Sequence, residues 1–177
     1  MRCTLVPHPD TPCGVVTELS VDVFRPAPGR LDLTYTLSGD LAGIRIAEAV
    51  SPARTDELWR RTCFEAFVHG PDGGYAEFNL SPSTQWAAYH FDGYRAGMAP
   101  LDLPAPPLIE RGEGTRTFAL SAALETGIES PGPWRLGLTA VIEEADGRLS
   151  YWALSHPPGK PDFHHSDGAT LTLGLGD

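Results

Sequence analysis

Polar and apolar residues alternate along much of the chain with a period of two. The longest run, Arg30-Leu31-Asp32-Leu33-Thr34-Tyr35-Thr36-Leu37, alternates without a break. The same pattern recurs in residues 19–23, 134–142 and 171–175. A period of two is typical of strands that bury one face. The sequence therefore predicts an all-β protein built mainly from antiparallel strands.

Turn sequences between these runs predict which strands pair. Asp146-Gly147 is typical of a two-residue hairpin, and Pro71-Asp72-Gly73-Gly74 is a longer turn signal. Ser38-Gly39-Asp40 marks another turn. Two hairpins are expected: residues 134–144 with 149–156, and residues 62–69 with 75–80.

Helix signals are scarce, and neither a βαβ rhythm nor an internal repeat is visible. The best helix candidate is a single turn at residues 55–59, which Thr55 could cap. The proline-rich stretch 98–107 is expected to be a long loop over the sheet surface. Because neither side of this loop has enough strands to close a core alone, we expect residues 1–177 to form a single antiparallel β-sandwich domain.

Composition and charge exclude several classes of partner. The chain has 177 residues, of which 41% are hydrophobic, enough for a sizeable core. Its formal net charge is -10 at pH 7. A chain this acidic repels phosphate backbones and lacks a basic patch for anionic lipid, so we expect neither nucleic-acid nor membrane binding.

Cysteine usage favours a reducing compartment. Cys3, Cys13 and Cys63 form no CxxC motif and no even set, which argues against a disulfide framework and a thiolate zinc site. The first residues contain no long apolar segment typical of a signal peptide, and no 18-residue apolar stretch occurs. We expect a cytoplasmic protein, with Cys63 as a small core residue or, alternatively, a lone nucleophile.

Two predicted strands carry polar residues where a buried or cupped face is expected. Glu65 shares a strand face with Cys63 and Phe67, and Glu77 shares one with Asn79. If these strands form a hairpin, the two glutamates can lie on the same face. Carboxylates and an amide near aromatic rings suit a hydroxyl-rich ligand. The alternative is an outer sheet face with ordinary solvated carboxylates.

The four tryptophans have different expected roles. Trp134 lies in a clean alternating run and is expected in the core, and the core is also favoured for Trp86 and Trp152. Trp59 follows a short turn just before a central strand. Its ring could stack on a sugar or a porphyrin, or it could be a lid over the core.

A late loop concentrates groups that can bind ligands. Residues 155–168 include several histidines, aspartates and a lysine: His156, Lys160, Asp162, His164, His165 and Asp167. Prolines stiffen this loop and lower the entropy cost of presenting these groups. Trp152 and His156 share a predicted strand face. The loop could instead be purely structural, or hold a metal through His156, Asp162 and His164 or His165, although no HExxH spacing supports the metal.

The chain contains no catalytic motif, since GxSxG, P-loop and GxGxxG patterns in a suitable context are missing. Glu65 and Glu77 could act as a glycosidase-type pair, but such an assignment depends on their separation.

Several segments together resemble an uncharacterised bacterial family of DOMON-like proteins. The resemblance covers most of the chain beyond about residue 20, and it is carried by residues 58–67, 75–82, 85–89, 94–98 and 160–168. The wider superfamily joins DOMON domains with family 9 carbohydrate-binding modules. This resemblance implies a jelly-roll-like sandwich of two antiparallel sheets.

The superfamily has a sugar-binding and a haem-binding branch. Trp59 followed by Glu65 is similar to the stacking tryptophan and hydrogen-bonding acid of the sugar-binding branch. That branch takes a second tryptophan from a late loop, where this sequence has Phe163. The haem branch uses a methionine and a later histidine as axial ligands. Met98 followed by His156, His164 or His165 has that order.

The leading interpretation is a non-catalytic domain that binds a small hydroxyl-rich ligand, most simply a carbohydrate, without a cofactor. Trp59 would stack on the ligand. The residues expected to complete the site are Glu65, Glu77, Asn79, Trp152, His156, Lys160, Asp162, His164 and His165. The alternatives are a b-type haem protein, an enzyme using Glu65, Glu77 and His156, and an assembly domain whose aromatic residues form a dimer interface.

Overall fold

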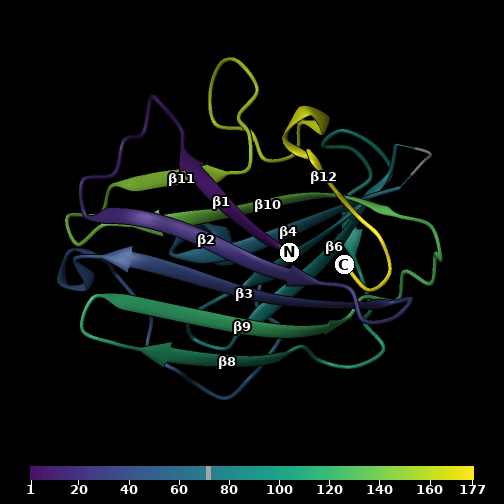
Figure 1. The fold of residues 1–177 in the computed structure, drawn as a ribbon, viewed down its shortest axis with the longest axis horizontal. Helices are drawn as coiled ribbons and strands as arrows, with labels where there is room; N and C mark the ends of the chain where they lie inside the picture. Colours follow the sequence, from purple (N-terminus) through teal and green to yellow (C-terminus); the bar gives the residue numbers. More distant parts are fainter. Residues whose placement is uncertain (71–72) are drawn as a thin grey trace.

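The computed structural model describes residues 1–70 and 73–177. Within these residues the chain forms twelve strands and three short 3-10 turns (Figure 1). The strands are β1 (Arg2–Pro7), β2 (Val16–Phe24), β3 (Arg30–Gly39), β4 (Cys63–His69), β5 (Tyr75–Leu80), β6 (Trp86–Phe91), β7 (Ala99–Pro100), β8 (Leu108–Glu113), β9 (Thr117–Glu125), β10 (Trp134–Glu143), β11 (Leu149–Ala153) and β12 (Leu171–Leu173). The 3-10 turns are η1 (Leu41–Gly43), η2 (Leu58–Arg60) and η3 (Ser166–Gly168).

The strands form one curled antiparallel sheet. Their order is β7-β6-β5-β4-β10-β11-β1-β2-β3-β9-β8, and β12 adds to β10. Strand β1 joins two halves, because Arg2 to Leu5 pair with β2 whereas Val6 and Pro7 pair with β11. We call β1, β2, β3, β9 and β8 the first sheet, and β4 to β7 with β10 to β12 the second sheet. The first sheet lies in front of β4 and β6 in Figure 1. The predicted antiparallel β-sandwich is therefore confirmed.

The main core lies between the two sheets. Strand β3 points Leu31, Leu33, Tyr35 and Leu37 inward, as its alternation predicts, and all four are buried. They belong to the same apolar cluster as Phe64 of β4. Each such side chain removed from water stabilises the fold by roughly 1.5–3 kcal/mol. This core covers the inner face of the second sheet, so the outer face packs against other parts of the chain.

The second sheet is also buried on its outer face. A second apolar cluster there contains Cys63, Phe67, Tyr75, Tyr89 and Phe91, with Leu58, Trp59 and Phe163 from the covering loops. Strands β4 and β5 are thus buried on both faces, as expected for central strands. This outer cluster surrounds the candidate site.

Both predicted hairpins form. Strand β10 pairs with β11, and β4 pairs with β5, placing Glu65 opposite Asn79 and Phe67 opposite Glu77. Pro71 and Asp72 of the predicted 71–74 turn lie outside the described residues.

The predicted single helical turn forms later than expected, as η2. The residue before it is Glu57, which has a φ of 62° and makes no side-chain cap. The predicted cap Thr55 is wrong, because its hydroxyl instead accepts a hydrogen bond of 2.8 Å from Gln85 Nε2. The 98–107 stretch is a loop except where Ala99 and Pro100 form β7 against β6.

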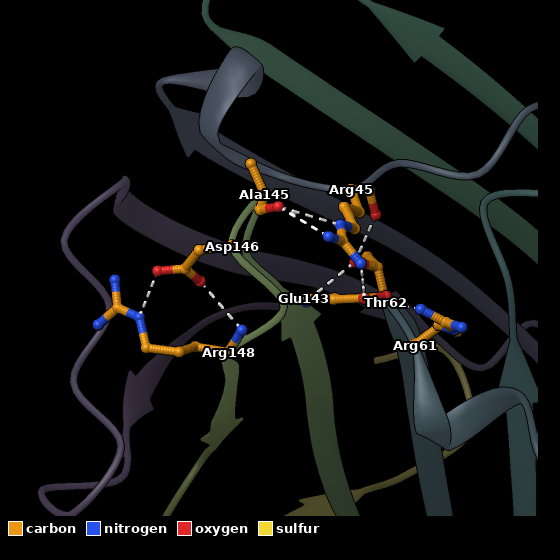
Figure 2. A network of polar contacts seen from close by, with 7 residues as sticks. All are labelled: Arg45, Arg61, Thr62, Glu143, Ala145, Asp146 and Arg148. Carbon is orange, nitrogen blue, oxygen red and sulfur yellow. Dashed lines mark hydrogen bonds and ion pairs between the residues drawn. The ribbon is translucent and has the colours of Figure 1, made fainter.

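A network of arginines fastens the segment before β4 to the end of β10 (Figure 2). Arg45 Nη1 and Arg61 Nη1 each donate to Glu143 Oε1 at 2.8 Å. Thr62 Oγ1 donates to the carbonyl of Arg45 and accepts from the Glu143 N–H. This network holds the chain that leads into η2 and β4.

None of the helical turns in the described residues has the length and apolar character to cross a membrane.

Candidate functional site

A cavity of about 380 Å³ lies against the outer face of the second sheet. The sheet supplies Glu65, Glu77, Phe91, Val141 and Tyr151. The covering segments supply the rest of the lining: Trp59, Arg95, Met98, Pro161, Phe163 and His164. The cavity therefore combines two carboxylates with aromatic walls.

Glu65 is a buried acid with one oxygen that has no partner. The residue is 2% exposed. Thr139 Oγ1 donates to Glu65 Oε2 at 3.4 Å, whereas Glu65 Oε1 is buried and has no hydrogen-bond partner in the part of the chain that the structure describes. Burial, followed by the charge of Glu77, raises the pKa of Glu65 well above its ordinary value. An unpaired polar atom at this position suits a ligand group that completes its hydrogen bond.

Glu77 lies diagonally across the hairpin from Glu65 on the same face. It is 5% exposed, and its Oε1 accepts a hydrogen bond of 2.7 Å from Asn79 Nδ2. Burial raises the pKa of Glu77 to about 6, against the opposing effects of Asn79 and Arg95. Asn79 is itself fully buried and orients Glu77.

His164 closes one side of the cavity. Its Nδ1 lies 2.8 Å from the Tyr75 hydroxyl and 4.0 Å from Glu77 Oε2. Burial, and then the charge of Arg95, lower the pKa of His164 to about 4, so its ring is neutral near pH 7. Because the Tyr75 oxygen also accepts from the Arg95 N–H, Tyr75 can donate its proton to the neutral His164 Nδ1.

Asp162 holds the loop beside His164 to the segment after β6. Its Oδ1 accepts from Arg95 Nη2 at 2.8 Å and from the His164 N–H at 3.1 Å. The Tyr94 hydroxyl donates to its Oδ2. Asp162 thus positions two residues of the lining, Arg95 and His164, rather than lining the cavity itself.

Trp59 forms an aromatic wall. Its ring packs edge-on against Tyr89, with centroids 5.9 Å apart. Tyr89 in turn donates its hydroxyl proton to Asp56 at 2.7 Å. These contacts orient the half-buried indole at the cavity. Phe163 of the late loop lines the same cavity and packs edge-on against Phe67 and Tyr151.

The structure thus brings together Trp59, Glu65, Glu77 and His164, with Asn79 and Asp162 in direct contact with lining residues. Four other expected residues lie elsewhere. Trp152 is buried in the main core, because alternation along β11 points Tyr151, rather than Trp152, toward the cavity. Its expected place in the site is wrong for this reason.

His156, Lys160 and His165 also lie outside this cavity. His156 Nε2 contacts the Val6 carbonyl at 2.9 Å, which ties the late loop to β1. Lys160 is exposed. His165 packs against Tyr94 and lines a neighbouring hollow. The proposed metal set of His156, Asp162 and His164 or His165 is not assembled, and no metal-binding group of three such side chains occurs within residues 1–70 and 73–177.

Five lining residues were given no binding role from the sequence: Phe91, Arg95, Val141, Tyr151 and Pro161. Strand alternation could have identified Tyr151 and Val141, since Val141 pairs directly with Tyr151 and with Cys63. Asp92-Gly93 is a turn signal just before Arg95, but the sequence does not predict that Arg95 itself takes a φ of 51°, a backbone state rare outside glycine.

A haem does not fit the cavity well. Met98 and His164 do line the same cavity, in the order that the haem branch uses. The carboxylates of Glu65 and Glu77, however, face the space that an apolar porphyrin would fill, and a porphyrin would leave Glu65 Oε1 without a partner. The lining therefore favours a polar ligand over haem.

The comparisons with known proteins concern the fold. No family model matches the chain, and no curated protein sequence matches it significantly. The structure is similar to the crystal structure of a "putative carbohydrate-binding protein" from Bacteroides uniformis ATCC 8492, with a TM-score of 0.64 and 14% sequence identity. The likeness covers 98% of this chain and 84% of that chain, so the two proteins share nearly the whole antiparallel β fold.

Proposed function

We propose that this protein binds a small hydroxyl-rich ligand, most simply a carbohydrate, in the cavity beside Trp59 and Glu65, without changing it chemically. The observation that carries this proposal is Glu65, which lines the cavity and whose buried Oε1 has no hydrogen-bond partner among residues 1–70 and 73–177. Leaving such a group unsatisfied costs about 1–3 kcal/mol, and more when the group is charged. A ligand that satisfies it recovers this free energy on binding.

A hydroxyl group matches Glu65 in either protonation state. The ionised carboxylate accepts hydrogen bonds only, whereas the neutral acid can also donate one. A hydroxyl can do both, and Asn79 keeps the neighbouring Glu77 Oε1 occupied, which leaves Glu77 Oε2 for a second ligand group. Two adjacent hydroxyls on a sugar ring fit this pair of acids.

The aromatic walls suit the other side of such a ligand. A sugar ring presents C–H groups on its faces, and these pack on indole and phenyl rings. Trp59 and Phe163 both line the cavity from covering segments. The similarity of fold to a protein described as putatively carbohydrate-binding supports the same ligand class.

Titration calorimetry against a panel of monosaccharides and short oligosaccharides tests this proposal. We expect saturable binding to at least one sugar, weakened roughly tenfold by Trp59→Ala, a loss of about 1.4 kcal/mol. Lys160→Ala is the matched control, because Lys160 is exposed on the late loop and does not line the cavity. Uniform absence of binding, or equal binding by the Trp59 variant, would contradict the proposal.

Hemin titration followed by absorbance separates the haem alternative. We expect no Soret band that depends on both Met98 and His164. A stoichiometric band lost in Met98→Ala would instead replace the carbohydrate proposal.

A further inference from the structure

The cavity holds two buried carboxylates without a cationic partner. Among residues 1–70 and 73–177, no lysine or arginine forms an ion pair with Glu65 or Glu77. Glu65 contacts the Thr139 hydroxyl, and Glu77 contacts the Asn79 amide. A buried carboxylate is costly unless it is paired or protonated. Arg95 acts on Glu77 through its charge, but its ion pair is with Asp162. Within the described residues, neither cavity carboxylate therefore has a lysine or arginine in direct contact.

A third glutamate on the same sheet face shows the contrast. Glu143 is 4% exposed, and it lies two alternations along β10 from Thr139, the partner of Glu65. Arg45 and Arg61 both contact its Oε1 at 2.8 Å (Figure 2). Among the described residues, the buried acid outside the cavity thus has two arginines in contact, whereas neither acid within the cavity forms an ion pair with a lysine or arginine.

The other charged groups at the cavity balance one another. Arg95 is the cation in the lining, and its Nη2 pairs with Asp162 at 2.8 Å. His164 is neutral near pH 7, because burial and Arg95 lower its pKa to about 4. The remaining charge at the cavity comes from Glu65 and Glu77, and it is negative or, after protonation, zero.

The walls of the cavity also suit a cation. Trp59, Phe91, Tyr151 and Phe163 all line it. Aromatic faces attract ammonium groups through their quadrupole, and more strongly where the ammonium is desolvated. Carboxylates combined with aromatic rings are the usual means of recognising an organic amine. The net charge of -10 further favours the approach of a cation.

We infer that the ligand of this cavity carries a protonated amine, as an amino sugar does, and that Glu65 Oε1 and Glu77 Oε2 accept hydrogen bonds from its ammonium group. This inference rests on the proposed function, since it names the class of sugar that enters the same cavity. The ammonium supplies three donors to the two free carboxylate oxygens, while the ring hydroxyls and C–H faces meet the remaining walls.

Protons compete with the amine for the same oxygens. The titratable or charged groups facing Glu77 are Glu65, Cys63, Tyr75, Tyr89, Arg95 and His164. Burial raises the pKa of Glu77 to about 6 and also raises the pKa of Glu65. Cys63, Tyr75 and Tyr89 have raised pKa values as well and stay neutral. Amine binding should therefore strengthen from pH 5 to pH 7 and release protons, as long as the amine remains protonated.

Matched sugar pairs test this inference on the intact wild-type protein. We would measure affinities by calorimetry for glucose, glucosamine and N-acetylglucosamine, and for the three corresponding galactose compounds, at pH 5 and pH 7. We expect one amino sugar to bind at least tenfold more tightly than its neutral parent at pH 7. The preference should shrink at pH 5, and the N-acetyl form, which lacks the charge, should behave like the parent.

The outcomes separate the inference from the proposed function. Equal binding of the neutral and amino forms overturns the inference and leaves the proposed function in place. Absence of binding by every sugar overturns both.

Glu77→Gln provides a second readout, because it removes the charge and keeps the size of the side chain. We expect this variant to lose the amine preference, with its fold checked by circular dichroism. Glu113→Gln is the control, since Glu113 is exposed on β8 of the first sheet. A preference that survives Glu77→Gln at pH 7 overturns the assignment of Glu77 as an ammonium acceptor.

Discussion

Glu65 and Glu143 are buried on the same face of adjacent strands, yet of these two acids only Glu143 has arginine partners among the described residues. Thr139 of β10 pairs with Glu65 of β4 and donates to its carboxylate, and Glu143 lies four residues further along β10. Arg45 and Arg61 bind Glu143, whereas Glu65 Oε1 has no partner. Glu143 therefore stabilises the fold, whereas Glu65 keeps an oxygen that can still accept a hydrogen bond from a ligand.

The different roles of these two acids predict opposite effects on stability. Glu143→Ala should lower the free energy of unfolding by about 1–3 kcal/mol, because it breaks both arginine contacts that hold the chain before β4. Urea denaturation monitored by tryptophan fluorescence measures this change. A variant as stable as the wild type would show that the network in Figure 2 does not fasten this segment.

Glu65→Met should stabilise the ligand-free protein. An apolar side chain of similar length removes the desolvation cost of a buried acid with one unpaired oxygen, and we expect a gain of about 1 kcal/mol in the free energy of unfolding. The same variant should lose ligand binding, as expected where function maintains a destabilising group. Loss of both stability and binding would mean that Glu65 serves the fold.

Stability should fall as pH rises through the range in which Glu77 titrates. The pKa of Glu77 is raised in the folded state from its ordinary value of 4.5 to about 6, so the folded protein binds more protons than the unfolded chain between these values. Stability is then highest below about pH 4.5, and about 2 kcal/mol is lost on passing pH 6. Glu65, whose pKa is also raised, acts in the same direction.

Urea denaturation of the wild type and Glu77→Gln from pH 4.5 to pH 7 measures this dependence. The variant lacks the titrating group, so its curve should be flatter over this interval. If the wild type instead became steadily more stable from pH 4.5 to pH 6 relative to the variant, Glu77 would not have a raised pKa in the folded protein.

Releasing Arg95 should weaken amine binding. Asp162→Asn removes the charge that pairs with Arg95, so the guanidinium becomes an uncompensated cation at the cavity and competes with an ammonium for Glu77. We expect roughly tenfold weaker binding of an amino sugar and little change for its neutral parent. Tyr94→Phe is the control, because it removes the other side-chain contact of Asp162 without changing charge. Equal losses in the two variants would point to a positioning effect instead.

Local patterns predicted most of the fold. The alternation in residues 30–37 identified β3 and its buried face, and Asp146-Gly147 identified the β10–β11 hairpin. The same reasoning placed Glu65 and Glu77 on one face, because a hairpin with a period of two fixes which side chains are neighbours. These features depend on residues close together in the sequence.

The rest of the site depends on long-range placement that local patterns do not carry. Trp152 was favoured for the core and also expected in the site, because it shares a predicted strand face with His156. The packing of β11 places Trp152 in the core and Tyr151 at the cavity. The place of Arg95 follows from its pairing with Asp162, 67 residues later in the chain. His156 likewise contacts a distant part of the chain, the Val6 carbonyl of β1, instead of the cavity. Such contacts are properties of the assembled sandwich.

The most direct test of the account follows the indole N–H signals of the four tryptophans by NMR while a sugar is added. Trp59 lines the cavity, whereas Trp86, Trp134 and Trp152 are buried in the main core. We predict that at least one sugar shifts the Trp59 signal in a saturable way and leaves the three core signals in place, and that Glu65→Met abolishes the shift. A Trp59 signal unmoved by every neutral and amino sugar would contradict the account.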